Sequence, residues 1–139
     1  MINVALFGFG RIGQMHAENL NKNKEIKLLY VHEKIDQLSK KAKKIYGCKI
    51  EKDYNKIFDD KKVDIIFISS PTNTHIKFIE EGMKRKKTIF CEKPLDLNIG
   101  KIYKTLRKVK KIKPKIQLGF NRRYDPGHFS LKRDLDKHK

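Results

Sequence analysis

The glycine-rich segment Gly8–Gly13, with the sequence GFGRIG, constrains the fold more than any other part of the chain. It joins an apolar run at 2–7 to an amphipathic stretch at 11–22, which predicts a strand, a tight turn and a helix in succession. In such a turn the first glycine allows the bend, the second leaves room for a ligand beside the backbone, and the third lets helix and strand pack closely. The segment therefore predicts a helix that begins at a bound anion.

The rest of the chain alternates short apolar runs with amphipathic stretches. Strands followed by helices in this regular way are typical of parallel sheets with crossover helices. We therefore predict an α/β fold with a doubly wound parallel sheet of the Rossmann type. The expected strands are 2–7, 26–31, 48–50, 63–68, 88–91 and 116–120, the expected helices are 11–22, 35–46, 54–58, 74–85 and 99–110, and a short segment follows Pro126.

The chain is strongly basic, with 34 Lys and Arg against 16 Asp and Glu and a formal net charge of +18. An excess of this size is also found in proteins that bind nucleic acids. Here, however, 28 of the basic residues are lysines spread through every predicted helix, and no helix-turn-helix, RNA-binding signature or Cys/His finger is present. We expect solvated lysine-rich faces and no specific nucleic-acid binding, with weak, salt-sensitive attraction to phosphates.

Other classes of protein are excluded by what the sequence lacks. No apolar run approaches the roughly 20 residues of a membrane-spanning helix, and no basic region precedes the first apolar strand, so neither a membrane protein nor a secreted one is expected. Cys48 and Cys91 lie far apart and form no CxxC pair. We expect two buried, reduced thiols, a cytoplasmic location and no metal site.

Glu33 lies at the end of the second predicted strand, 20 residues after Gly13. A carboxylate at this point accepts hydrogen bonds from the ribose hydroxyls of a dinucleotide. Its charge would repel the 2′-phosphate of NADP, so NAD is the favoured cofactor, although the neighbouring Lys34 opposes that preference. The alternative is a glycine-rich turn without a ligand.

Two polar segments follow later strands of the predicted sheet. Ser69–His75 comes after the strand at 63–68, and Cys91–Pro94 comes after the strand at 88–91. Because ligands of open parallel sheets bind outside the carboxyl ends of the strands, both segments are expected beside the cofactor. Each also has an ordinary interpretation: Asn73 as the cap of the next helix, His75 as a first-turn helix residue, and Lys93 as a solvated lysine.

Four segments occur in order along the chain: Gly8–Gly13, Ser70–His75, Glu92–Pro94 and Gly119–Asp125, the last with the sequence GFNRRYD. Together they resemble the N-terminal half of the glucose–fructose oxidoreductase and inositol dehydrogenase family, over essentially all 139 residues. The beginning of the chain and the last segment are most similar to the inositol 2-dehydrogenases of that family. The resemblance implies a Rossmann domain that binds NAD(P) and a reaction at a secondary alcohol of a polyol or sugar.

The resemblance also implies roles for individual residues. Lys93 corresponds to a lysine beside the nicotinamide and the reacting hydroxyl, which makes it the candidate catalytic residue. Pro94 corresponds to a proline that often follows a cis bond, and Arg123 to an arginine that reaches the substrate, as does Lys93. The candidate cofactor contacts are Gly8, Phe9, Gly10, Arg11, Ile12, Gly13, Glu33, Ser70, Pro71, Thr72, Asn73, His75, Glu92 and Lys93.

One departure from the family pattern bears on the activity. In the family, a His–Asp base comes from a second α+β domain, which also forms most of the interface of the homo-oligomer. This sequence stops at Lys139, where that domain would begin. We therefore expect an NAD(P)-binding domain at 1–120, the start of a connector at 121–139, and an absent substrate domain. The chain is then interpreted as the cofactor-binding half of an NAD-dependent oxidoreductase, or alternatively as a truncated, non-catalytic dinucleotide-binding remnant.

Overall fold

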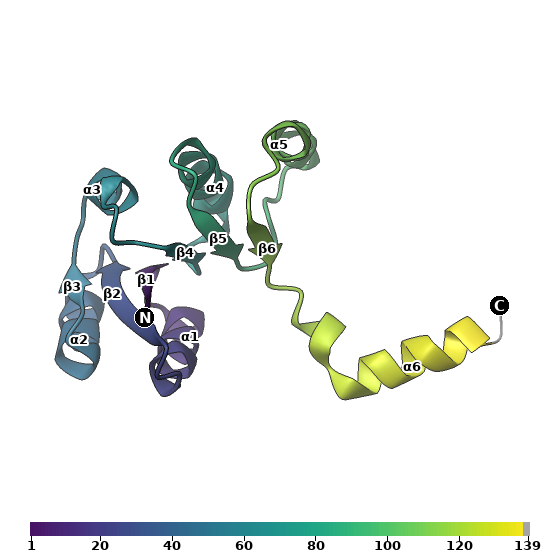
Figure 1. Cartoon of the computed structure of the whole chain (residues 1–139), viewed down its shortest axis with the longest axis horizontal. Coiled ribbons are helices and arrows are strands. Elements are labelled where there is room, and N and C mark those ends of the chain that lie inside the picture. Colours follow the sequence, from purple (N-terminus) through teal and green to yellow (C-terminus); the bar gives the residue numbers. More distant parts are fainter. Residues whose placement is uncertain (138–139) are drawn as a thin grey trace.

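Six parallel strands form one sheet in the computed structural model, which describes residues 1–137 (Figure 1). The strand order, β3-β2-β1-β4-β5-β6, is that of the doubly wound Rossmann fold, so the predicted fold class is confirmed. The strands are β1 (Ile2–Phe7), β2 (Ile26–His32), β3 (Lys49–Ile50), β4 (Ile65–Ile68), β5 (Thr88–Cys91) and β6 (Ile116–Leu118).

Helices cover the sheet from both sides. Figure 1 shows α1 (Arg11–Lys22) and α2 (Asp36–Tyr46) on one face, and α3 (Tyr54–Asp59), α4 (His75–Lys84) and α5 (Ile99–Ile112) on the other. Two 3₁₀ turns, η1 (Thr72–Thr74) and η2 (Asn121–Tyr124), and the helix α6 (Pro126–Lys137) complete the described chain.

The apolar core has two layers, one on each face of the sheet. Successive residues of a strand point to opposite faces. Ala5 and Phe7 of β1 therefore belong to the layer under α3 and α4, whereas Val4 and Leu6 belong to the layer under α1 and α2. All four are fully buried. A central strand buried on both faces explains why β1 has the nearly continuous apolar sequence that predicted it.

All of the expected strands and helices are present, and their ends differ from the prediction by at most two residues. The helical spacing of Ile35, Leu38, Ala42 and Ile45, and that of Ile99, Ile102, Leu106 and Val109, predicts one buried apolar face on α2 and one on α5. The structure agrees with these two faces only in part. Ile35 and Ile45, assigned to the buried side of α2, are 57% and 55% exposed, and the buried residue of α5 is Thr105 instead of its neighbour Leu106. Both helices flank the short edge strands β3 and β6, which offer too little surface to cover a whole helix face.

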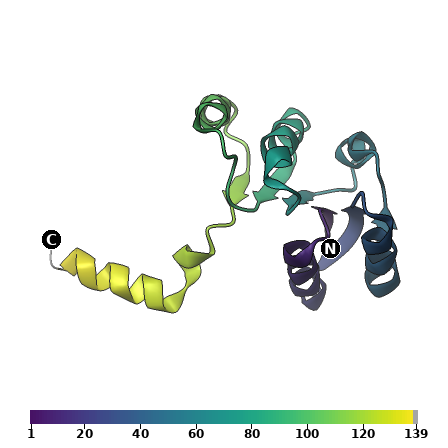
Figure 2. The same ribbon diagram turned by 180° about the vertical axis from the view of Figure 1, so that it is seen from behind.

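The segment after Pro126 was expected to be short, but it forms the 12-residue helix α6. Figures 1 and 2 show that it extends away from the sheet. Phe129, Leu131 and Leu135 are therefore about 60% exposed on its surface. No helix in residues 1–137 combines the length and the apolar character needed to cross a membrane.

Cys48 and Cys91 are free and buried, as the sequence predicted. Burial raises the pKa of both thiols, and that of Cys91 reaches about 12. The thiolate is the reactive form, so both groups should be protonated and unreactive in the folded protein. We expect a chromogenic thiol reagent at about pH 8 to label the native protein on the order of 100-fold more slowly than the urea-unfolded protein. Rapid labelling of the native protein would contradict this.

Candidate cofactor and substrate site

The three glycines of the turn after β1 have three different environments. Gly8 has φ +89°, and a Cβ there would lie 2.6 Å from the Ser70 Cα. A Cβ on Gly13 would lie 2.2 Å from the Gly8 carbonyl oxygen. A Cβ on Gly10, in contrast, would meet no atom within 4 Å. Gly8 and Gly13 are therefore required by packing, whereas the space beside Gly10 is open to a ligand.

The helix α1 begins without a cap at this open position. Gly10 is its N-cap residue, no side chain accepts from its first turn, and the first turn contains no acidic residue. The side chains of Asp53 and Asn98 cap α3 and α5, whereas α2 and α4, like α1, begin without a side-chain cap. The first N–H groups of α1 therefore remain available, and together with the helix dipole they favour a negatively charged group such as a pyrophosphate.

The carboxylate of Glu33 lies directly against the glycine turn. One of its oxygens accepts a hydrogen bond of 2.8 Å from the backbone N–H of Phe9, and the other accepts one of 2.9 Å from that of Ile35. Each carboxylate oxygen has a second lone pair, so the group can still accept from ribose hydroxyls. The Phe9 side chain is buried against Tyr46, which leaves only the backbone of Phe9 for ligand contact.

The loop after β4 is tied to the same turn. Ser69 Oγ lies 3.0 Å from the carbonyl oxygen of Gly8 and 3.2 Å from that of Phe7 and donates to them. The hydroxyls of Ser70 and Thr74 lie 2.6 Å apart, and Thr74 donates to the Pro71 carbonyl. Asn73 is exposed in η1 and does not cap α4, so the capping interpretation of this residue was wrong.

His75 lies beneath this loop instead of on its outer face. Its side chain is 2% exposed, and its two ring nitrogens each lie 2.8 Å from a carbonyl oxygen, Nε2 from Ser70 and Nδ1 from Pro94. The ring therefore joins the loop after β4 to the loop after β5. Because its polar atoms face the protein, we assign His75 to the positioning of these loops, where the sequence had suggested a direct cofactor contact.

The segment after β5 contains the candidate catalytic lysine. Lys93 is exposed, and the peptide bond between it and Pro94 is cis, in agreement with the resemblance. Glu92 accepts a hydrogen bond of 3.1 Å from the Lys93 backbone N–H with one oxygen, and its other oxygen lies 2.8 Å from Nε2 of His16 on α1. Sequence reasoning missed His16, since nothing around it marks a residue that contacts position 92.

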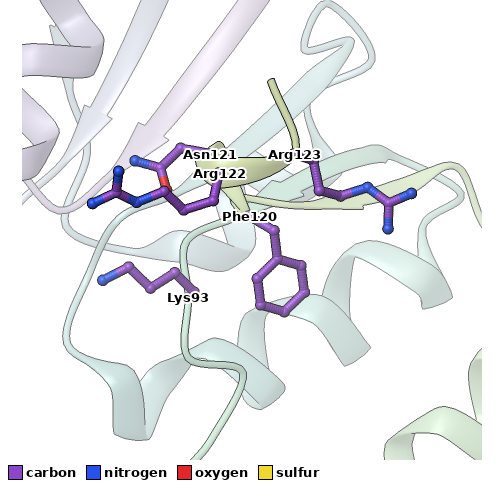
Figure 3. A pocket seen from close by; sticks show the side chains of 5 residues that line it. All are labelled: Lys93, Phe120, Asn121, Arg122 and Arg123. Atoms are coloured by element: carbon purple, nitrogen blue, oxygen red, sulfur yellow. The ribbon is translucent and has the colours of Figure 1, made fainter. Parts of the chain in front are cut away.

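A pocket of about 560 Å³ opens beside Lys93. Its other lining residues, Phe120, Asn121, Arg122 and Arg123, follow β6 (Figure 3). In Figure 3 the side chain of Arg122 extends on the same side as that of Lys93, whereas that of Arg123 extends to the opposite side. The sequence had selected Arg123 of this pair, so Arg122 is an additional candidate for substrate contact.

The expected site residues thus come together at one edge of the sheet. Gly8–Gly13, Glu33, Ser70–Thr74 and Glu92–Lys93 follow β1, β2, β4 and β5. The carboxyl ends of parallel strands are where open α/β sheets bind their ligands. Within residues 1–137, no group of three or more His, Cys, Asp or Glu side chains is arranged to hold a metal ion.

A Rossmann sheet with an open glycine turn, a helix that starts there without a side-chain cap and a carboxylate at the end of the second strand is typical of dinucleotide-binding domains. Residues 2–120 match the family model GFO/IDH/MocA, described as an oxidoreductase family with an NAD-binding Rossmann fold, and the chain belongs to this family.

Curated relatives match nearly the whole chain. Myo-inositol 2-dehydrogenase of Thermotoga maritima is 35% identical over 137 residues, and inositol 2-dehydrogenase of Rhizobium meliloti is 33% identical over 135, each covering 97% of this chain. The crystal structure of scyllo-inositol dehydrogenase from Lactobacillus casei with NAD(H) and scyllo-inositol covers 99% of the chain at 31% identity, with a TM-score of 0.90. The chain spans only 41% of the length of each of these three proteins.

Substitutions at Gly10 and Gly13 should have different effects, the first on NADH binding and the second on the free energy of unfolding. Gly10→Val adds a side chain to open space, so we expect near-native stability and loss of NADH binding at millimolar cofactor. Gly13→Ala forces a Cβ against the Gly8 backbone, and we expect it to lower the free energy of unfolding by about 1–3 kcal/mol. Urea denaturation and NADH fluorescence titration measure the two effects. Normal NADH affinity in Gly10→Val would contradict the assignment of this space.

Proposed function

We propose that this chain binds NAD(H) along the strand ends and forms the cofactor-binding half of a polyol dehydrogenase of the inositol 2-dehydrogenase type. The observation that carries the proposal is the open space at Gly10, between two packed glycines and at the start of a helix without a cap. An anion of the size of a pyrophosphate fits the charge and the hydrogen-bonding capacity of this position. The relatives' names support the inositol type.

The remaining site residues divide between the two ends of the cofactor. The Glu33 carboxylate would hold the hydroxyls of the adenosine ribose, and the loop from Ser70 together with Lys93 would flank the nicotinamide. Bound NAD supplies the acceptor for a hydride from the carbon of a secondary alcohol. Lys93 can donate a hydrogen bond to the substrate hydroxyl, and Arg122 and Arg123 offer further donors in the same pocket.

A pocket lined by Lys93, Asn121 and two arginines suits a molecule with many hydroxyl oxygens. The N–H donors of these side chains are spread over the pocket, and Phe120 adds an apolar wall. This combination of one apolar surface and several donors is typical of sites that orient small polar ligands. It supports a polyol or a sugar as the substrate class, without fixing which one.

The cofactor preference tests the assignment of Glu33. We expect the 139-residue chain to bind NADH, and to bind NADPH at least about tenfold more weakly, because the Glu33 carboxylate would face the 2′-phosphate. Glu33→Gln should narrow this difference by weakening NADH binding and relieving the repulsion. Lys34→Gln is the matched control beside it and should leave NADH affinity unchanged while weakening NADPH further. Calorimetric titration of the three proteins with each cofactor measures all six affinities. Tighter binding of NADPH than of NADH by the wild-type chain would overturn the assignment.

The alternative function, dinucleotide binding without catalysis, is favoured by the openness of the pocket. Its five lining residues include no histidine and no carboxylate, and Lys93 is exposed. Oxidation of an alcohol needs a group that accepts the hydroxyl proton and a substrate held in near-attack geometry. The described residues contribute only one side of such a site.

We therefore expect the 139-residue chain alone not to oxidise polyols. NADH formation from myo-inositol, scyllo-inositol and related sugars, followed by absorbance, should stay below about 1 s⁻¹, the low end of typical enzyme turnover. The same preparation must bind NADH, so that a lack of turnover is not caused by a lack of cofactor. Faster turnover would show that Lys93 and its neighbours suffice for proton transfer.

A further inference from the structure

Glu92 is closely packed between the end of β4, the segment after β6 and the helix α1. The backbone N–H of Glu92 donates to the carbonyl of Ile68 at the end of β4. Its side chain lies against Gly119, where a Cβ would come within 3.0 Å of Oε1 and 3.1 Å of Cδ. Gly119 itself donates to the Cys91 carbonyl. The absence of a side chain at position 119 therefore leaves the room that the carboxylate fills.

His16 reaches this carboxylate from the other side of the sheet edge. Its ring packs against Phe67 of β4 and Phe90 of β5, with centroid distances of 4.6 and 5.7 Å, and its Nε2 lies 2.8 Å from Oε1 of Glu92. The side chains of His16 and Glu92 are only 16% and 18% exposed. A hydrogen bond to a carboxylate in such partial burial is stronger than one in water. His16 thereby connects α1 with the segment that contains Lys93.

We propose that His16 is a positioning residue for the nicotinamide end of the cofactor site. His16 holds one oxygen of Glu92, and the other oxygen then stays on the backbone N–H of Lys93, 3.1 Å away. The turn 91–94 and the base of the Lys93 side chain are fixed in this way. The inference rests on the proposed function, in which Lys93 flanks the nicotinamide.

If His16 positions only the nicotinamide end of the site, its substitution should weaken the binding of a ligand that contains nicotinamide. It should leave unchanged the binding of a ligand without one. ADP-ribose contains the pyrophosphate and the adenosine of NADH but no nicotinamide. The side chain of His16 interacts with Glu92, Phe67 and Phe90, at the ends of β4 and β5, whereas Glu33 holds the turn after β1. The binding of ADP-ribose should therefore not depend on His16. A purely structural role would lower the stability of the whole domain and would affect both ligands equally.

The experiment measures the dissociation constants of NADH and ADP-ribose for the 139-residue chain by calorimetry. His16→Leu keeps the apolar packing and removes the donor, and it should weaken NADH about tenfold, the scale of one hydrogen bond to a charged group. ADP-ribose should change less than about twofold, and His16→Gln, which retains a donor, should recover most of the NADH affinity. His128→Leu removes an exposed histidine with a comparable 2.9 Å contact to Asp125 and serves as the control.

A double-mutant cycle tests whether His16 acts through Glu92. Glu92→Ala should reproduce the selective loss of NADH binding, and adding His16→Leu to it should change the NADH constant by less than about twofold. If His16→Leu does not fold, the NADH and ADP-ribose constants of Glu92→Ala test the same prediction. Equal losses of affinity for both ligands, or additive losses of NADH affinity in the cycle, would overturn the inference about His16 and leave the proposed function intact. A wild-type chain that binds neither ligand would overturn the proposed function, and the inference with it.

Discussion

The close approach of the turn after β1 to its neighbours is the constraint on which the site depends. Gly13 packs on the carbonyl of Gly8, and Gly8 packs on the backbone of Ser70, at separations that leave no room for a methyl group. These contacts bring the start of α1 next to the ends of β1 and β4. The hydroxyl of Ser69 then completes the junction by donating to the turn. The tight packing of Gly8 and Gly13 thereby places the open space beside Gly10 at the start of α1, where we propose that the anion binds.

Two histidines connect this junction with Lys93, the candidate catalytic residue. His75 joins the carbonyls of Ser70 and Pro94, and His16 holds the carboxylate that accepts from Lys93. Each ring nitrogen of His75 lies 2.8 Å from one of these carbonyl oxygens, so the ring sets the spacing between the two loops. Both histidines lie on helices, which are more precise supports than loops. The exposed Lys93 is therefore attached to a segment fixed on two sides.

The sequence predicted those parts of the molecule that depend on patterns of neighbouring residues. Apolar runs and helical spacing located the six strands and the helices α1 to α5, but not the helix α6. The glycine pattern and Glu33 follow neighbouring strands, and their assignment to the pyrophosphate and the ribose stays a prediction. The contact of His16 with Glu92 spans 76 positions, and no periodicity or spacing reports such a pair. The position of His75 could not be predicted for the same reason, because its burial depends on a loop 19 residues away. Which of Arg122 and Arg123 lies beside Lys93 depends on the turn η2, which no local pattern fixed.

Charge alone cannot give this chain its selectivity. With a net charge of +18, we expect it to attract any polyphosphate at low ionic strength, and this attraction should weaken steeply as salt is added. Discrimination must come from groups that act at short range. The proposed function assigns the open space at Gly10 to the pyrophosphate, and it places the Glu33 carboxylate, held by two backbone N–H groups, where the 2′-phosphate of NADP would lie. A carboxylate fixed in this way repels a phosphate at one position, although the chain as a whole attracts phosphates. Its effect on cofactor choice should therefore persist at salt concentrations that abolish the nonspecific binding of phosphates.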